Sequence, residues 1–488
     1  MIGSFLHRLA YPDFYRAHEK RGGELREAHH HEARGGRLRG AEVRSVQLRG
    51  EYLFTAQGSG GLVVLDVANV DNKDFSERVV SAPVSPLGQR TFVPTRDATA
   101  VALPTTMPVA PWRRGDPANH EQAMHPLYHY ALVTDRQEGL IFVDVDTLTD
   151  ADPQNNFLRR ALTWNPDGVL DGATNLAIAG NTVYVVARRG LVVVDASEPL
   201  APKVVATLGG FDQPAAVAVQ FRYAFVADRQ GLAVVDVTDP RVPRLAARAS
   251  GFAAGSVYVA RTYAYLAAGK QGVAIVDVER PERPVVDQLF DAGGKLDDVR
   301  DVKVGSTDAS LFAYVANGGH GLAVLQLTSP ETVPGYLGFS PHPAPRLIAT
   351  RRTRGPALAL SKGLDRDRAA DESGNQVSVF NRMGARPLNA EETRRLYLRG
   401  GAVYTVTDQP PGPAGSAGAV AAKPPGAPTV PAAPAAPAGL AKPGAQTAPV
   451  PVAAGAPAGS AAKAAAQLVK ARAASPTYPQ PAPQERRP

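Results

Sequence analysis

One short pattern recurs along the chain and constrains its fold more than any other feature. A glycine opens an apolar run that ends in aspartate, and a polar turn with a proline follows, as in GLAVVDVTDP at residues 231–240. Six copies begin at Gly61, Gly139, Gly190, Gly231, Gly272 and Gly321, and the last three intervals are 41, 41 and 49 residues. A period of about 40 residues built from strands is the length of one four-stranded propeller blade.

One complete unit shows how the strands follow each other. Apolar stretches at 215–220, 223–228, 231–237 and 244–250 are separated by polar turns, which predicts four antiparallel strands in sequence. The third stretch is apolar at nearly every position, so both of its faces should be buried between neighbouring blades. Its opening glycine is expected to have a positive φ or to allow a close backbone approach, and the proline after the turn ends the strand.

The strand and turn at 190–199, 231–240 and 272–281 match the consensus of the LVIVD-repeat family almost residue for residue. The chain therefore resembles this family over about 42–330, although Gln326 replaces the aspartate in the sixth unit. The resemblance implies an all-β protein, a β-propeller of the kind found largely in exported or surface proteins of prokaryotes. It implies a scaffold and no general activity.

The number of blades depends on how the end of the repeat region is interpreted. After six clear units, GPALALSKG at 355–363 and NQVSVFNRMGARPLN at 375–389 resemble a degenerate seventh, with Asn381 in place of its aspartate. A further half unit, LYLRGGAVYTVTD at 396–408, echoes VQLRGEYLFTAQ near the start. Propellers often complete one blade with strands from both chain ends, which removes exposed edges. We expect seven blades, with six and eight as alternatives.

Composition divides the chain into three zones. Residues 1–41 form a basic, His-containing N-terminal arm, 42–408 form the propeller, and 409–488 form an Ala/Pro/Gly-rich tail. The tail has too few large apolar side chains to offset its ordering entropy, so it is expected to be a disordered spacer. Of the net charge of +7, the tail carries +6 and the first 40 residues +3, which leaves the propeller near neutral. We therefore expect no specific nucleic-acid binding by the propeller.

Several classes of site are excluded or disfavoured. The chain has no cysteine, which rules out disulfides, thiolate metal sites and a cysteine nucleophile. It has no apolar run of membrane-spanning length and no visible signal peptide, and it lacks the linear motifs of phosphate loops, serine hydrolases and zinc proteases. We expect no cofactor, no metal and no catalytic residue, and the histidines at 29–31 are taken as adventitious metal binders.

The repeated aspartates are the most conspicuous acidic residues: Asp66, Asp144, Asp195, Asp236 and Asp277. Calcium needs six to eight oxygens around one point, whereas these carboxylates lie in different blades. We expect each aspartate to accept hydrogen bonds from the turn that ends its own strand.

The turns between the second and third strands differ in charge from blade to blade. A partner-binding rim is predicted there, made of Asp135, Arg136, Arg188, Arg189, Asp228, Arg229, Lys270 and His320. These turns share a propeller face with the connections between blades, where propellers most often bind partners. The rim could hold an anionic ligand or an acidic protein surface, or could simply be a solvated set of turns.

An insertion at about 105–127 separates the first two strands of the second blade. A connection of this length is uncommon unless it is functional or disordered. Trp112, Arg113 and Arg114 are a possible anchor for a partner, and His120, His125 and His129 lie in or beside the insertion. The alternative is a simple cap over one face of the propeller.

These observations favour a non-catalytic propeller, monomeric, that acts as a protein interaction or assembly scaffold. The resemblance implies that it works outside the cytoplasm or at the cell surface, although a cytoplasmic protein is not excluded. The alternative is a propeller enzyme or small-ligand-binding protein with a site in the central channel. Convergent His, Asp and Arg side chains in the channel would favour the alternative, and an apolar filling would favour the scaffold.

Overall fold

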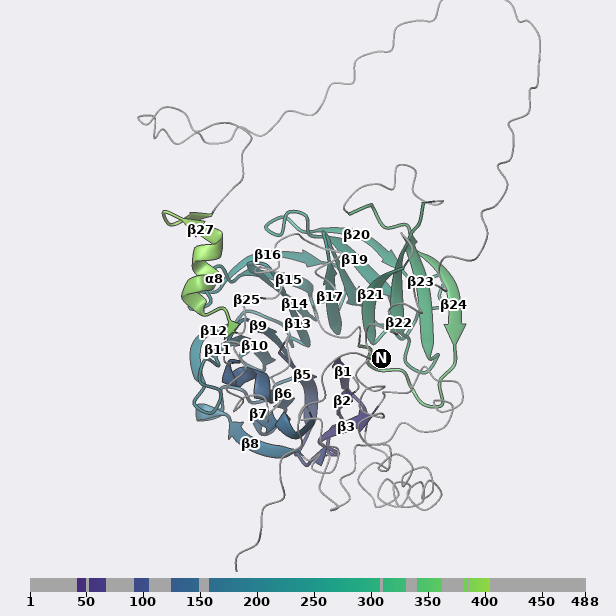
Figure 1. Ribbon diagram of the computed structural model, residues 1–488. Coiled ribbons are helices and arrows are strands. Elements are labelled where there is room, and N and C mark those ends of the chain that lie inside the picture. Colours follow the sequence, from purple (N-terminus) through teal and green to yellow (C-terminus); the bar gives the residue numbers. More distant parts are fainter. Residues whose placement is uncertain are drawn as a thin grey trace, which may run out of the picture. The chain divides into compact units, whose positions relative to one another are not determined.

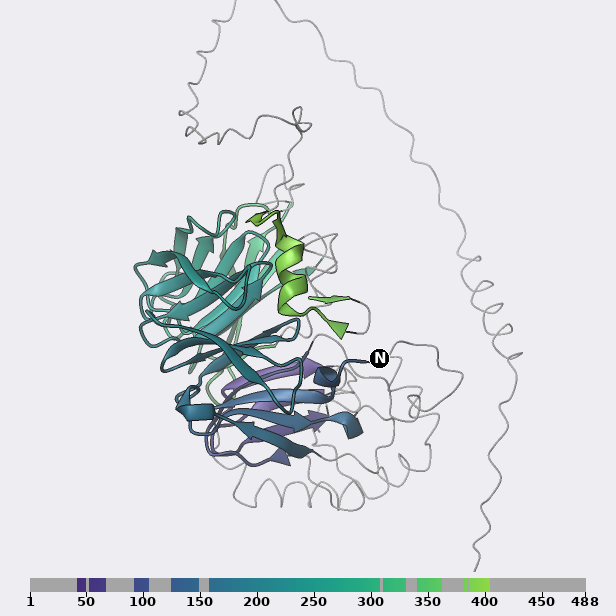
Figure 2. The same cartoon turned by 90° about the vertical axis from the view of Figure 1, so that its left-hand side faces the viewer.

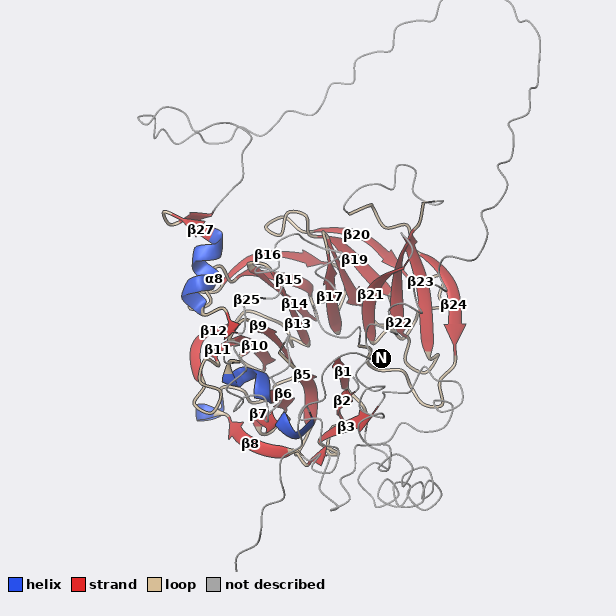
Figure 3. Cartoon of the chain, in the orientation of Figure 1, coloured by secondary structure: helices blue, strands red, loops and turns tan. Residues whose placement is uncertain are grey.

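The computed structural model describes residues 42–49, 52–66, 92–104, 124–148, 158–307, 310–330, 340–361, 381–383 and 386–403. Within them, six four-stranded antiparallel sheets are arranged around a ring, with the first strand of each sheet innermost and the fourth outermost (Figures 1 and 3). The strands of every sheet pair in sequence order, so each blade is a simple meander. The chain is an all-β propeller, as predicted.

The strand bounds of the first three blades follow the chain. Blade one contains β1 (Ser45–Arg49), β2 (Tyr52–Ala56), β3 (Leu62–Asp66) and β4 (Phe92–Val93). Blade two contains β5 (Ala98–Ala102), β6 (Tyr130–Asp135), β7 (Gly139–Asp144) and β8 (Arg159–Trp164). Blade three contains β9 (Asn175–Ala179), β10 (Thr182–Ala187), β11 (Gly190–Asp195) and β12 (Lys203–Leu208).

The other three blades repeat the arrangement. Blade four contains β13 (Ala216–Gln220), β14 (Tyr223–Asp228), β15 (Gly231–Asp236) and β16 (Arg244–Ser250). Blade five contains β17 (Ser256–Ala260), β18 (Tyr263–Ala267), β19 (Val273–Asp277) and β20 (Val285–Phe290). Blade six contains β21 (Asp301–Thr307), β22 (Ser310–Ala316), β23 (Leu322–Thr328) and β24 (Arg346–Arg351).

The core consists of the seams between successive blades. In β15, Leu232 and Val234 pack into a cluster with blade five, while Ala233 and Val235 pack into a cluster with blade three. Alternate residues of a strand point to opposite sides of the sheet, so a strand that is packed on both sides must be apolar throughout. This packing is the physical reason for the continuous apolar run in each repeat.

The glycine that opens each third strand fits for two reasons. Gly231 has a φ of +124°, and a Cβ at this position would lie 2.2 Å from the carbonyl oxygen of Ala249 in the neighbouring fourth strand. The equivalent glycines share both properties. An added Cβ would lie 2.1–2.3 Å from the nearest carbonyl oxygen at Gly61, Gly190, Gly272 and Gly321. The expected positive φ and the close backbone approach are both confirmed.

The pairing between the third and fourth strands contains a bulge at the same place in five of the blades. In blades two to six the register between the third and fourth strands shifts by one residue, for example between Val234 and Val235 of β15. Such a bulge increases the local twist and makes an exposed edge a poorer template for another strand. The repeat therefore contains its own protection against edge-to-edge association.

The described residues hold six complete blades, so the expected count of seven is corrected to the six-bladed alternative. The first part of the predicted seventh unit nevertheless lies between blades six and one. The Ala357 amide donates to Gly318 O (2.9 Å) and the Leu360 amide to Asp301 Oδ2 (2.8 Å), while the Leu48 amide donates to Ser361 Oγ (2.9 Å). Residues 357–361 thus connect the last blade to the first.

The rest of the predicted seventh unit and the predicted half unit lie apart from these residues. β25 (Arg382–Met383) and β26 (Arg386–Pro387) form one hairpin, and helix α8 (Ala390–Tyr397) leads into a second, β27 (Leu398–Arg399) and β28 (Ala402–Val403). Figure 2 shows α8 and the hairpins against one side of the ring. Neither hairpin joins a blade, since each forms a separate two-stranded sheet, and a capping box fixes the start of α8 between them.

Contacts with blades three and four hold this segment, which we call the C-terminal clip (381–383 and 386–403). The carbonyl of Leu388, a residue only 2% exposed, accepts the Asn181 amide at 3.0 Å. Arg241 lies 3.6 Å from Glu391 of α8. The clip therefore covers turns that join the first to the second strand and the third to the fourth.

Replacing Gly231 by alanine should destabilise the propeller more than the same change at Gly251. Gly251 also has a positive φ, +109°, but no atom lies within 4 Å of its added Cβ. Gly251→Ala should cost only the left-handed strain, about 1–2 kcal/mol, whereas Gly231→Ala must also displace the Ala249 carbonyl. Urea unfolding of both variants measures the difference, and equal losses would contradict the close-approach explanation.

Candidate interaction surface

Two sets of loops share one end of the blades, which we call the front face. They are the turns between second and third strands and the connections that lead from each blade to the next, because the strands within a blade alternate in direction. The Arg136 amide donates to Asp97 O (3.0 Å), and the Arg188 and Arg229 amides make the same bond to Asp171 and Asp212. The predicted rim residues therefore stand on turns whose backbone is fixed.

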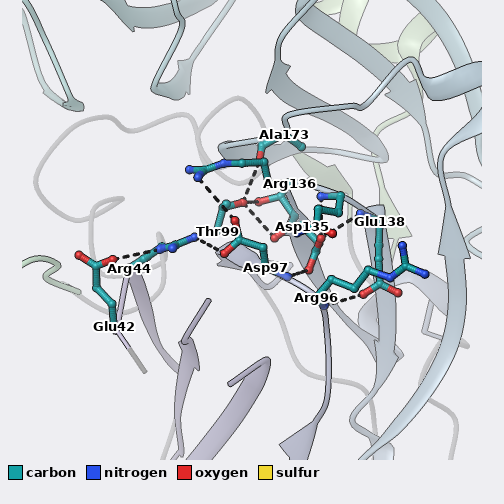
Figure 4. Close-up of polar contacts among 11 residues, drawn as sticks. Glu42, Arg44, Arg96, Asp97, Thr99, Asp135, Arg136, Glu138 and Ala173 are labelled. Atoms are coloured by element: carbon teal, nitrogen blue, oxygen red, sulfur yellow. Dashed lines mark hydrogen bonds and ion pairs between the residues drawn. The ribbon is translucent and has the colours of Figure 1, made fainter. Parts of the chain in front are cut away.

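Asp135 is a structural member of the rim. It is fully buried, and its Oδ1 accepts the amides of Gln137 (2.8 Å) and Glu138 (2.9 Å) in its own turn. Its Oδ2 accepts the Asp97 amide of the connection into the blade (Figure 4). Nearby, Thr99 donates to the Ala173 carbonyl of blade three at 3.0 Å.

Asp228 has the same role in blade four. It is fully buried and accepts hydrogen bonds from the amides of Gln230 (2.9 Å) and Asp212 (3.2 Å). It also forms an ion pair with Arg248 at 2.8 Å. The structure therefore places the two predicted acidic rim residues inside the protein, where they hold loops together and cannot reach a partner.

The remaining predicted rim residues are exposed and fall into two groups. In the first, the charge is engaged within the chain. Arg136 lies 3.5 Å from Asp97, Arg189 donates to the Asp167 carbonyl at 3.2 Å, and His320 lies 3.0 Å from Asp297. Asp97 also pairs with Arg44, which continues the network shown in Figure 4.

Arg188, Arg229 and Lys270 form the second group, which we call the free cations. They are exposed on blades three, four and five, at the equivalent turn of each. Within the part of the chain that the structure describes, no hydrogen bond or ion pair engages their charged groups. The Arg229 amide donates to the Asp212 carbonyl at 2.9 Å, but no ion pair joins the two side chains. The free cations are therefore available to a ligand.

The repeated aspartates are turn caps, as expected. The amide two residues further on donates to the Oδ1 of Asp144 (3.1 Å), Asp195 (2.9 Å), Asp236 (2.9 Å) and Asp277 (2.8 Å). In the sixth unit Gln326 accepts a bond from Arg346 instead. The side chain of Asp66 is not among those that the structure describes. Among the described residues, no group of three or more acidic or histidine side chains is placed to hold a metal ion.

Only the end of the predicted insertion is described. His125 caps the 3-10 helix η2 (Pro126–His129), accepting the Leu127 amide at 3.2 Å, and burial lowers the pKa of His125 below its usual range. His129 is paired with Asp146. The possible anchor, Trp112, Arg113 and Arg114, and also His120 lie outside the described residues and stay predictions.

The innermost strands carry a polar cluster that the sequence analysis missed. Asp301, which is 8% exposed, accepts hydrogen bonds from Ser256 (2.5 Å), Lys303 (2.6 Å) and the Leu360 amide (2.8 Å). Similar bonds join Ser45 to the Val101 amide. These side chains link neighbouring first strands across the seams. The repeat alignment gave no sign of the cluster because the residue at the start of the first strand differs among the blades: it is serine in blades one and five but aspartate in blade six.

Asp228→Ala should cost about 3 kcal/mol of folding free energy, because it leaves Arg248 and two loop amides without their acceptor. Arg188→Ala removes no bond within the described chain, so its effect should stay within about 0.5 kcal/mol. Chemical unfolding of both variants tests this division of the rim, which would fail if Asp228→Ala were as harmless as Arg188→Ala.

Comparison with known proteins agrees with this architecture. The LVIVD repeat matches at residues 40–79, 172–208, 215–249 and 252–288. No curated protein matches the chain. No helix in the described residues is long and apolar enough to cross a membrane.

Solved structures that resemble the chain do so at low identity. A Lactobacillus plantarum protein is 12% identical with a TM-score of 0.43, covering 65% of this chain and 86% of its own. The RRP9 WD40 repeats are 14% identical with a TM-score of 0.40, covering 66% and 84%. U3-55K is 13% identical with a TM-score of 0.39, covering 66% and 86%. With four repeat matches falling on a ring of four-stranded blades, the chain is an LVIVD-repeat β-propeller protein.

Proposed function

We propose that this propeller is a non-catalytic scaffold that binds an acidic surface of a protein partner through the front face of blades three to five. One observation carries the proposal: three successive blades present an exposed cation that has no partner among the described residues, namely Arg188, Arg229 and Lys270. Unpaired charges of one sign on a surface speed association with a partner of opposite charge and select it.

The backbone beneath these side chains supports the same reading. The Arg229 turn is held by Asp228 from within and by the Asp212 carbonyl at 2.9 Å, and the Arg188 turn by Asp171 at 3.0 Å. A partner that meets these residues orders only the side chains, since the turns are already fixed, which lowers the entropic cost of binding.

A location outside the cytoplasm or at the cell surface is part of the proposal and rests on the family resemblance. The Ala/Pro/Gly-rich residues 409–488 would then act as a spacer between the propeller and its attachment. Fractionation of the source cells checks the location, and recovery of the protein only from the cytoplasm would oppose it.

Reversing the charge at two free cations, Arg188→Glu with Arg229→Glu, should abolish capture of the partner. Affinity purification from the source lysate followed by mass spectrometry measures the effect, and the captured partner should dissociate as salt rises because the contacts are electrostatic. An unchanged list of captured proteins would contradict the proposal.

The same two blades offer a matched control. Lys203→Glu with Arg244→Glu makes the same charge change at exposed residues that begin β12 and β16, at the opposite end of those blades. This variant should keep the partner. Loss of the partner in both variants would show a dependence on net charge and not on the front face. Melting curves of both variants confirm that the ring is intact.

A further inference from the structure

A buried arginine at the meeting of blades one and two has no ion-pair partner among the residues that the structure describes. Arg49 ends β1, and the residue is only 3% exposed. One terminal nitrogen of its guanidinium is fully buried without a hydrogen-bond partner. Among the described residues, no acceptor or carboxylate is bonded to any nitrogen of this side chain.

The surroundings of Arg49 do not neutralise it. The guanidinium lies over the ring of Phe54, 5.7 Å from the ring centre, and Phe54 belongs to the apolar cluster between blades one and two. Asp146 is the acidic group whose charge acts on Arg49, but it is paired with His129 and forms no ion pair with the arginine. Burial lowers the pKa of Arg49 to about 10, so the side chain is still charged at neutral pH.

Burying a charge of this kind destabilises the fold unless a group of opposite charge pairs with it. Buried arginines are almost always paired, and an apolar side chain of similar volume in the same place is often more stable. A ring contact to Phe54 offsets only a small part of that cost. The remaining donors of a planar guanidinium match the two oxygens of a carboxylate or phosphate.

We propose that Arg49 binds a small oxyanion, a carboxylate or a phosphate group, at the seam between blades one and two. The site lies where β1 ends, which is the end of the blade opposite the front face. It is separate from the free cations and does not depend on the partner proposed for them. Because Asp146 is paired with His129, the guanidinium of Arg49 is the group that would contact the anion.

Thermal unfolding of the full chain with added sodium phosphate or sodium acetate tests the site, with sodium chloride at equal ionic strength as reference. The wild-type melting temperature should rise saturably with one of the two anions beyond the chloride effect, and the stronger anion identifies the class of ligand. Isothermal titration with the same salts should give a saturable heat. Absence of saturable binding by both anions would overturn the proposal.

Arg49→Met removes the charge and keeps most of the volume. This variant should bind the anion at least about tenfold more weakly, because it loses a charge-assisted pair, and without anion it should be at least as stable as the wild type. Anion binding as tight as in the wild type would overturn the proposal.

Arg222→Met in blade four is the matched control. Arg222 also stacks on a ring, Tyr223, 4.3 Å from the ring centre, but Asp236 and Glu282 already pair with it. This variant should lower basal stability and leave the anion effect intact. If Arg49→Met fails to fold, Arg49→Lys keeps the charge but loses the planar pair of donors, so it should bind phosphate more weakly than the wild type. Phosphate affinity equal to that of the wild type would overturn the proposal.

Discussion

Packing of each third strand between two neighbouring blades is the interaction on which the rest of the structure depends. A strand such as β15 gives one set of side chains to blade three and the other to blade five, so no blade has a complete core of its own. The ring must therefore close for the first and last blades to be stable. Residues 357–361 lie at that closure and reach both Asp301 and Leu48.

This constraint separates the positions of the repeat into two kinds. The opening glycine, the apolar run and the capping aspartate serve the seam and the turn, and they recur because every blade needs them. The exposed residue two positions before this glycine in blades three to five serves neither. At this position blades three, four and five carry Arg188, Arg229 and Lys270, whereas blade one carries Ser59. A binding surface can change there without disturbing the core.

The sequence predicted what depends on local pattern. The strands of β13–β16, the positive φ of Gly231 and the capping role of Asp236 all follow from residues within one unit, and each is confirmed. The sequence did not show that Asp228 is buried, because this residue resembles any polar turn residue. Its burial depends on Arg248 and on the Asp212 amide, 20 and 16 residues away in the chain.

The features that escaped prediction are all non-local. Part of the clip resembles half a blade in sequence. It lies against blade three instead, where the Asn181 amide donates to the Leu388 carbonyl. The absence of a described partner for Arg49 depends on which side chains meet at the seam of blades one and two. The Asp301 cluster depends on contacts among three different segments of the chain. A single sequence does not show which distant segments meet at a seam.

The closure of the ring is the central claim, and hydrogen exchange at individual amides tests it most directly. The amides of Ala98, Gly172, Ala254 and Val299 each donate to a front-face carbonyl of the preceding blade, at 2.9–3.1 Å, and the Ala357 amide makes the equivalent bond to Gly318 at 2.9 Å. If residues 357–361 close the ring, Ala357 and Leu360 will be protected to the same degree as these four amides. Exchange of Ala357 and Leu360 at the rate of exposed loops, with the other four protected, would contradict the account.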